Sequence, residues 1–344
     1  MLGLGVAFAA QLFANGLAPV DPGSDAASAR ECEACHPAEH AEWSASRHGR
    51  AFTNPIFQRE YSAHPDEWCV HCHAPLTKQL EEVRSGAGVL AAEGVNCIAC
   101  HVRRGRILAA RKRPGSPHAT DVRAGFGGPS FCAGCHQFNF PQLDNVTPHL
   151  RTRVTGYTSH PMQNTVAEHA AGPHASEPCR SCHASPAEHA YPGGHDAAML
   201  ERALSLDVCR RGRDVVATVT NRGAGHRVPT GDVHRHLALR LWKASAPEKL
   251  QEHFMLRHFE PLADGGKALV EDTGLAPGQS RAYRATSRAL GGEDDEPVSI
   301  ELRFVYTIDE FPLHELGERA FTTVAKQMVL LPQLPSCGAA AQRR

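Results

Sequence analysis

The sequence repeats one Cys-x-x-Cys-His motif five times, as CEACH (32–36), CVHCH (69–73), CIACH (97–101), CAGCH (132–136) and CRSCH (179–183). Histidine fills only 22 of 344 positions. The chance that all five cysteine pairs are followed by histidine is therefore on the order of one in a million. Two thiols three positions apart can add to the two vinyl groups of one haem, and the adjacent histidine then reaches the iron. The motifs predict five covalently bound c-type haems.

Each motif supplies two thioether bonds and one proximal imidazole. The predicted attachment residues are Cys32, Cys35, Cys69, Cys72, Cys97, Cys100, Cys132, Cys135, Cys179 and Cys182. The predicted proximal iron ligands are His36, His73, His101, His136 and His183.

Zinc sites and disulfides are the two alternatives for these ten cysteines. Zinc ribbons use pairs of CxxC knuckles about 15–20 residues apart and need no histidine at the next position. Here the motif starts lie 37, 28, 35 and 47 residues apart, and their number is odd. A disulfide framework would suit an exported chain, but it gives no reason for the five histidines. Both alternatives rank well below haem attachment.

Cys209 and Cys337 lie outside the motifs, near the two ends of the C-terminal region. In an oxidising compartment a disulfide between them would join the ends of that region. Two buried free thiols are the alternative.

Each low-spin haem needs a second, distal ligand, and many histidines remain outside the motifs. Three similar stretches, AEHAEWSASRH, AEHAAGPH and AEHAYPGGH, each place a second histidine after Ala-Glu-His. They end at His48, His174 and His195, and two further stretches offer His118 and His160. We predict His48, His118 and His195 as distal ligands, with His174 or His160 serving another haem.

Other histidines of this region are weaker candidates. His189 is the alternative to His195, because both belong to the same stretch. We assign the rest to surface or hydrogen-bonding roles, which are the commoner uses of a lone histidine; these are His40, His64, His149 and His169.

The loop NRGAGHRVPTGD (221–232) carries a further candidate, His226. Gly223 and Gly225 let the backbone approach a flat macrocycle closely. Pro229 and the following turn stiffen the loop, which favours a ligand held in place before binding. We predict that His226 is a distal ligand, and an exposed histidine in a well-made turn is the alternative.

Composition narrows the class of protein. The formal net charge of −1 argues against a nucleic-acid binder. Five ferric haems, each contributing about −1, would bring the total to about −6. The basic run RRGRILAARKR (103–113) is therefore predicted to neutralise haem propionates, with docking of an acidic partner or a solvated loop as alternatives.

The chain divides by pattern into a signal-like segment and linker (1–29), a pentahaem cytochrome domain (30–200), a β-sandwich domain (201–337) and a tail (338–344). The whole chain has only 6% aromatic residues, with 30 glycines and 24 prolines. The haem region is predicted to have short helices and loops around stacked haems, with few strands. Strands are predicted at 204–208, 214–221, 236–242 and 298–308, where apolar and polar residues alternate. About seven short strands in all favour an immunoglobulin- or fibronectin-like sandwich.

The first 20 residues carry no charge and resemble the apolar region of a secretory signal. Gln11, Asn15, Gly16 and Pro19 interrupt this stretch and disfavour a transmembrane anchor. We predict export, to the periplasm or beyond.

CEACHPAEHAEWSASRHGRAF resembles the first haem segment of the tetrahaem cytochrome family that accepts electrons from hydroxylamine oxidoreductase. In that family a W-x-x-S-x-H pattern provides a distal ligand, which corresponds to His48 here. GVNCIACHV and HAYPGGHDAAMLERAL resemble multihaem cytochromes with a C-terminal β-domain. The resemblance implies a haem-stacked electron-transfer fold, often with one haem left open.

The expected function is electron transfer through five haems between redox partner proteins outside the cytoplasm. The alternative is an oxidoreductase acting on a small nitrogen or sulfur compound at one open haem, which needs an acid/base neighbour. No CxxCK variant is present, which favours the carrier. A docking role for the β-domain ranks last.

Overall fold

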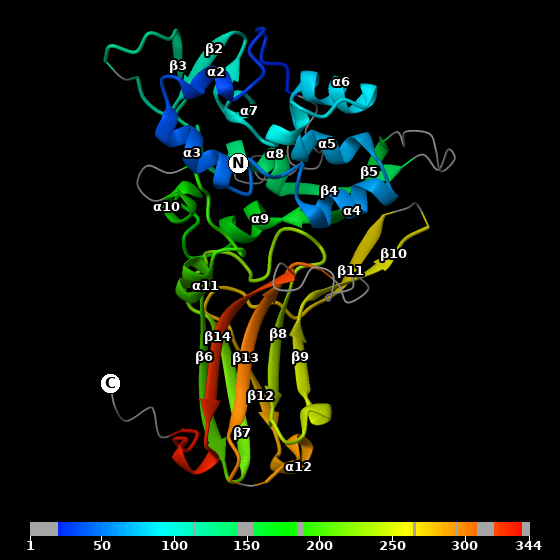
Figure 1. Cartoon of the computed structure of the whole chain (residues 1–344), viewed down its shortest axis with the longest axis vertical. Coiled ribbons are helices and arrows are strands. Elements are labelled where there is room, and N and C mark those ends of the chain that lie inside the picture. Colours follow the sequence, from blue (N-terminus) through cyan, green and yellow to red (C-terminus); the bar gives the residue numbers. More distant parts are fainter. Residues whose placement is uncertain are drawn as a thin grey trace, which may run out of the picture. The chain divides into compact units, whose positions relative to one another are not determined.

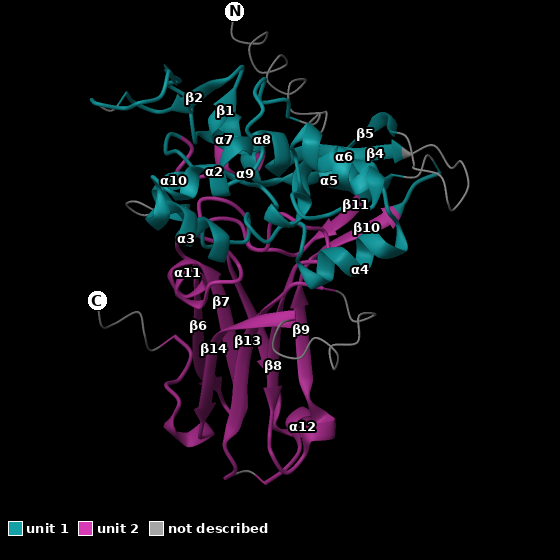
Figure 2. Cartoon of the chain, turned by 45° about the horizontal axis from the view of Figure 1, so that its top comes forward, with its two compact units in different colours: residues 1–166, 176–192, 261–268 teal, residues 167–175, 193–260, 269–344 magenta. Residues whose placement is uncertain are grey.

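The computed structural model describes residues 20–112, 114–143, 154–184, 189–263, 266–293, 295–307 and 320–338. Most of the signal-like segment, the tail beyond residue 338 and His149 lie outside these ranges. The chain forms two compact units (Figure 2). Unit 1 comprises residues 1–166, 176–192 and 261–268, and unit 2 comprises 167–175, 193–260 and 269–344. All five motifs belong to unit 1.

Unit 1 consists of short helices joined by loops (Figure 1). Several helices start where the sequence offers a cap or a proline: Asn54 caps α4, Asn96 caps α7, and Pro129 opens α8. The helices are α2 (Arg30–Glu33), α3 (Pro37–Ala45), α4 (Pro55–Ala63), α5 (Glu67–His73), α6 (Thr77–Ser85), η1 (Ala91–Glu93), α7 (Cys97–His101), α8 (Pro129–His136) and α10 (Arg180–His183). Short helices at the motifs were predicted and are confirmed.

The strands of unit 1 form two small sheets. The first has the order β1 (Val102–Arg103), β2 (Arg106–Ala109), β3 (Thr120–Val122). The second pairs β4 (Gln137–Leu143) with β5 (Val154–Asn164) in an antiparallel ladder with three register shifts. The sequence pattern does not predict this second ladder, because prolines and glycines interrupt the alternation on which strand prediction depends.

Among the described residues of unit 1, buried apolar side chains form two small clusters. One contains Val20, Leu76, Ile98, Ala99 and Val102. The other contains Val70, Ala74, Leu80 and Ala91. Both clusters include residues of motif helices, Ile98 in α7 and Val70 in α5.

The two larger sheets of unit 2 are antiparallel, and their strands run along a common direction (Figure 1). One has the order β12 (Ser280–Ala285), β7 (Asp214–Asn221), β6 (Leu204–Arg211). The other has the order β14 (Phe321–Val329), β13 (Val298–Val305), β8 (His236–Trp242), β9 (Gln251–Met255). The remaining elements are α9 (Thr165–Ala170), α11 (Ala197–Ala203), η2 (Pro247–Lys249), β10 (Arg257–Pro261), β11 (Lys267–Asp272), α12 (Ser287–Leu290) and η4 (Leu331–Gln333). Three of these, α9, β10 and β11, have residues in both units.

The core of unit 2 is built from strand residues in register. Ile300 lies opposite Leu241 and Leu302 opposite Leu239, and all four side chains are fully buried. The predicted strands 214–221 and 236–242 are confirmed at both ends, as β7 and β8. The predicted strand 298–308 ends at Val305 as β13.

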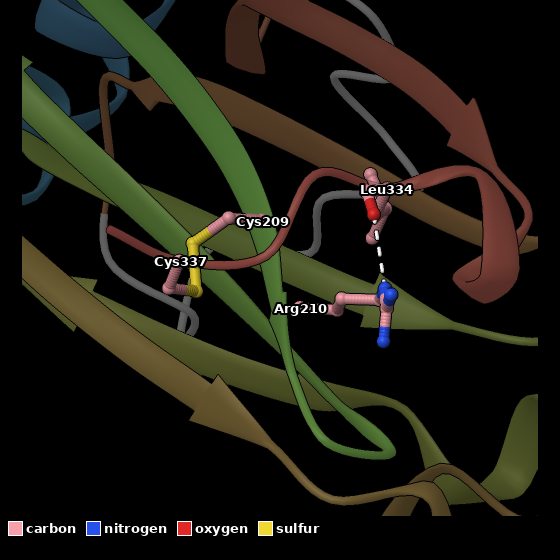
Figure 3. Close-up of a disulfide and its surroundings, with 4 residues drawn as sticks. All are labelled: Cys209, Arg210, Leu334 and Cys337. Carbon is pink, nitrogen blue, oxygen red and sulfur yellow. Dashed lines mark hydrogen bonds between the residues drawn. A yellow bond between two sulfur atoms is a disulfide. The ribbon is translucent and has the colours of Figure 1, made fainter. Parts of the chain in front are cut away.

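A disulfide joins Cys209 of β6 to Cys337, with the two Cα atoms 5.1 Å apart (Figure 3). Two backbone bonds flank it: the Arg210 amide donates to the Pro335 carbonyl, and the Cys337 amide donates to the Arg210 carbonyl. The Arg210 guanidinium Nε also donates to the Leu334 carbonyl at 3.0 Å. The predicted disulfide is confirmed.

No helix within the described ranges is long and apolar enough to cross a membrane.

Candidate haem-binding sites

Four of the five motif histidines are the last residue of a short helix that contains the second motif cysteine. His73, His101, His136 and His183 are the last residues of α5, α7, α8 and α10. In the first motif, the His36 amide donates to the Cys32 carbonyl at 2.9 Å, which continues the helical turn of α2. Residues at i, i+3 and i+4 share one face of a helix. Each motif therefore presents two thiols and one imidazole to the same side.

All ten motif cysteines are free thiols, in contrast to Cys209 and Cys337. This contradicts the alternative in which the motifs form a disulfide framework. Within the described ranges, no group of three or more His, Cys, Asp or Glu side chains is arranged to hold a metal ion directly.

Thiols of different motifs lie against one another. Cys32 hydrogen-bonds with Cys97, and this bond lowers the pKa of Cys32 to about 7 while raising that of Cys97. A hydrogen bond with Cys132 likewise lowers the pKa of Cys179 to about 7. A thiol that donates to its neighbour stabilises the neighbour's thiolate form. These bonds place the first motif beside the third, and the fourth beside the fifth.

A third thiol contact joins the second and fourth motifs. The pKa of Cys135 is raised, mainly by a hydrogen bond with Cys72 and to a smaller extent by burial. Cys135 also interacts electrostatically with Cys100 of the third motif. The fourth motif therefore has the second, third and fifth motifs as neighbours.

Three motif histidines are fixed through Nδ1 by backbone carbonyls. His73 bonds with the Ala51 carbonyl at 2.8 Å, His101 with Leu108 at 3.0 Å, and His183 with Pro192 at 2.6 Å. A histidine whose Nδ1 proton is donated in this way directs its other nitrogen, Nε2, to a metal. The geometry suits the proximal role predicted for each of them.

Three pairs of histidine rings have the separation expected across one iron. With a metal–nitrogen distance of about 2.0–2.1 Å and about 1.1 Å from nitrogen to ring centre, two opposing imidazoles have centres about 6.2–6.4 Å apart. The ring centres of His36 and His118 are 6.3 Å apart. Those of His48 and His136 are also 6.3 Å apart, and those of His101 and His189 are 6.2 Å apart. Each pair joins one motif histidine to one histidine from elsewhere in the chain.

The angles between these ring planes are 27°, 65° and 40°. Such variation is compatible with a shared iron, because rotation about the iron–nitrogen axis changes the angle and leaves the separation unchanged.

Burial favours the neutral form of two of these rings. It is the largest cause that lowers the pKa of His48, with the charge of His183 as a smaller cause. Burial also lowers the pKa of His101. A neutral imidazole has the lone pair that a metal requires, so this environment favours ligation.

The predicted distal ligands lie in different parts of the structure. His48 and His118 lie opposite motif histidines in unit 1. His174, His195 and His226 belong to unit 2, and His160 lies in β5 of unit 1. The ring opposite His101 is that of His189, which the sequence ranked below His195. The stretch AEHAYPGGH contains both histidines, and spacing along the chain could not distinguish them.

The three histidines of unit 2 are held by different contacts. The His195 ring stacks on Tyr306 at 3.7 Å. The His226 Nδ1 bonds with the Arg227 carbonyl at 2.8 Å, the arrangement seen at three motif histidines. A side chain added at Gly225 would meet the His174 ring at 3.2 Å, so glycine permits this close packing.

Two arginines of the basic run 103–113 bind neighbouring parts of the backbone and a side chain of the same sheet. The guanidinium of Arg103 donates to the carbonyls of Val102 and Ala99, which closes α7. Arg106 pairs with Asp121 at 2.6 Å across β2 and β3. Neutralisation of haem propionates by this run stays a prediction.

These residues fit c-type haems: paired free thiols, an adjacent imidazole with its Nδ1 fixed, and a second imidazole at the distance required across an iron. The haem would supply the redox-active iron, and the protein would supply the attachment points and the axial ligands.

Comparison with known proteins agrees with this chemistry. The family model described as cytochrome c554 and c-prime matches residues 31–102. A penta-heme cytochrome c552 from Thermochromatium tepidum matches 88% of this chain and 98% of its own, at 21% identity and a TM-score of 0.62. No curated protein sequence matches. The chain has the fold of a multihaem c-type cytochrome.

Proposed function

We propose that this protein transfers electrons through five c-type haems, one on each motif, between redox partner proteins outside the cytoplasm. The observation that carries the proposal is the set of three histidine pairs at 6.2–6.3 Å, each containing a motif histidine. An iron with two imidazoles has no open position for a substrate, so it exchanges electrons without binding one. The penta-heme neighbour and the cytochrome c554 match support the same reading.

The thiol contacts suggest the order of the haems. The first motif adjoins the third through Cys32 and Cys97, and the third adjoins the fourth through Cys100 and Cys135. The second and fifth motifs each adjoin the fourth. We propose a path of three haems, first to third to fourth, with the second and fifth haems both beside the fourth.

For the second and fifth haems we propose distal ligands among His174, His195 and His226. The Nδ1 bond of His226 and the stacking of His195 on Tyr306 each hold an imidazole in a defined orientation. Ligands gain from such support because less freedom is lost on binding.

Three further features belong to the same proposal. The two sheets of unit 2 form an immunoglobulin- or fibronectin-like sandwich. The uncharged N-terminal stretch directs export to the periplasm or beyond, which agrees with the disulfide of unit 2. The donor and acceptor are themselves redox proteins.

Electron paramagnetic resonance of the oxidised holo-protein tests the function. We expect low-spin ferric signals that do not change when nitrite, hydroxylamine or sulfite is added. A high-spin signal that shifts on adding one of these compounds would favour an enzyme with an open haem.

A further inference from the structure

The segment His189–Pro192 lies beside the axial histidines of three different haem sites. The His189 ring itself lies opposite His101, at 6.2 Å. The Tyr191 ring lies 5.2 Å from the His48 ring, in a T-shaped arrangement. The Pro192 carbonyl accepts the Nδ1 bond of His183, at 2.6 Å. These three histidines belong to the sites of the third, fourth and fifth motifs.

The segment has an unfavourable backbone conformation. Tyr191 has φ +44°, a region that residues with a side chain rarely adopt. Such a conformation persists only where surrounding contacts hold it in place, and it is frequent at functional sites. Gly193 and Gly194 come directly after this segment, and either could adopt a positive φ without cost. The positive φ nevertheless falls on Tyr191.

Glu42 attaches this segment to α3. Its carboxylate Oε2 accepts a hydrogen bond from the His189 backbone amide at 2.9 Å. The same oxygen lies 3.9 Å from the His189 Nδ1. That nitrogen is buried, and within the described ranges no atom completes a hydrogen bond with it. The carboxylate that holds the His189 backbone therefore also lies close to its imidazole.

We propose that His189–Pro192 is a shared positioning segment for the axial histidines of three haems, and that Glu42 holds it in place. The proposal rests on the proposed function, because it takes His48, His101, His183 and His189 as iron ligands. Glu42 has two separate effects, one through its hydrogen bond and one through its charge. Its hydrogen bond fixes the backbone that all three contacts share, and its charge acts on the nearest imidazole alone.

Two substitutions of Glu42 separate these effects. Glu42→Gln keeps an oxygen that accepts the His189 amide and removes the charge. A lost negative charge stabilises the reduced iron, so we expect one haem, that of the third motif, to favour reduction about tenfold more, a rise of about 59 mV for one electron. Glu42→Ala removes the bond as well, and we expect the potentials and the low-spin g-values of three haems to change.

Glu39→Ala is the matched control. Glu39 lies on the same helix, and its carboxylate is 4.0 Å from the Nδ1 of His36. We expect this variant to alter at most the haem of the first motif. Tyr191→Gly provides a second test that leaves Glu42 intact: glycine accepts the positive φ, and only the ring beside His48 is lost. We expect a change at the haem of the fourth motif alone.

Redox titration of the full-length holo-proteins measures the potentials, and electron paramagnetic resonance measures the spin states and g-values of the haems. The proposal is overturned if Glu42→Ala alters no more haems than Glu42→Gln, or if Tyr191→Gly alters haems other than that of the fourth motif. If Glu42→Ala fails to assemble, a Glu42→Gln variant without the single-haem shift overturns the role of the carboxylate. A wild-type protein without low-spin haems contradicts the proposed function instead.

Discussion

Replacing His189 by alanine should change one haem of five from low-spin to high-spin. The His189 and His101 ring centres are 6.2 Å apart, within the range of about 6.2–6.4 Å expected for two imidazoles on one iron. The proximal side should survive the substitution, because the His101 Nδ1 keeps its bond to the Leu108 carbonyl at 3.0 Å. The variant therefore loses one axial ligand and retains all five haems.

The expected loss is one fifth of the low-spin ferric signal, with a high-spin signal of the same integrated intensity. Electron paramagnetic resonance of the oxidised protein measures both quantities. Free imidazole should restore the low-spin state, since it can occupy the space that the side chain leaves. His195→Ala is the matched comparison, because the sequence ranked that histidine first, and it should leave the haem of the third motif unchanged.

A low-spin signal of unchanged intensity in His189→Ala would refute the pairing of His189 with His101. Conversion of the third-motif haem in His195→Ala, and not in His189→Ala, would show that His195 is the ligand, as the sequence predicts.

Three further predictions follow from other contacts. His118→Ala should convert the haem of His36 to high-spin, and His48→Ala should convert the haem of His136. The double variant should convert both haems, and unchanged spin states would reject these pairs. Replacing Cys209 and Cys337 by serine opens a loop of 128 residues and should lower the free energy of unfolding by about 5 kcal/mol. Urea titration monitored by circular dichroism measures this change, and an unchanged unfolding midpoint would contradict it. Burial raises the pKa of Glu168, which accepts a bond from Thr230, so its folded form binds a proton more tightly than the unfolded chain. The wild type should therefore lose stability as pH rises from about 4 towards neutrality, and Glu168→Gln should abolish that part of the loss; parallel stability curves for the two proteins would reject it.

The motifs, the disulfide and two strands could be predicted from sequence because each depends on local spacing or on pairing by elimination. Cys-x-x-Cys-His is a single helical turn, and the structure places four of the five histidines at a helix end. Cys209 and Cys337 were the only cysteines outside the motifs, and they bond. β7 and β8 are strongly apolar strands, and both of their ends were found.

Distal ligands could be predicted only in part, because ligation depends on distance in space. The tryptophan-containing pattern around His48 gave a local signal, and His48 lies opposite His136. His189 and His195 are six positions apart in one stretch, so no periodicity or composition separates them. The contacts of His189 with Glu42 and His101 join residues far apart in the chain. The β4–β5 ladder was missed for a related reason, since Pro141 and Pro161 break the pattern that marks a strand.

The number of haems per chain tests the central claim most directly. A pyridine haemochrome assay against protein mass, on the purified holo-protein, should give five covalently bound haems per chain. Replacing both cysteines of one motif, such as Cys97 and Cys100, by serine should give four. A holo-protein with far fewer than five haems, or with zinc in their place, would contradict the account.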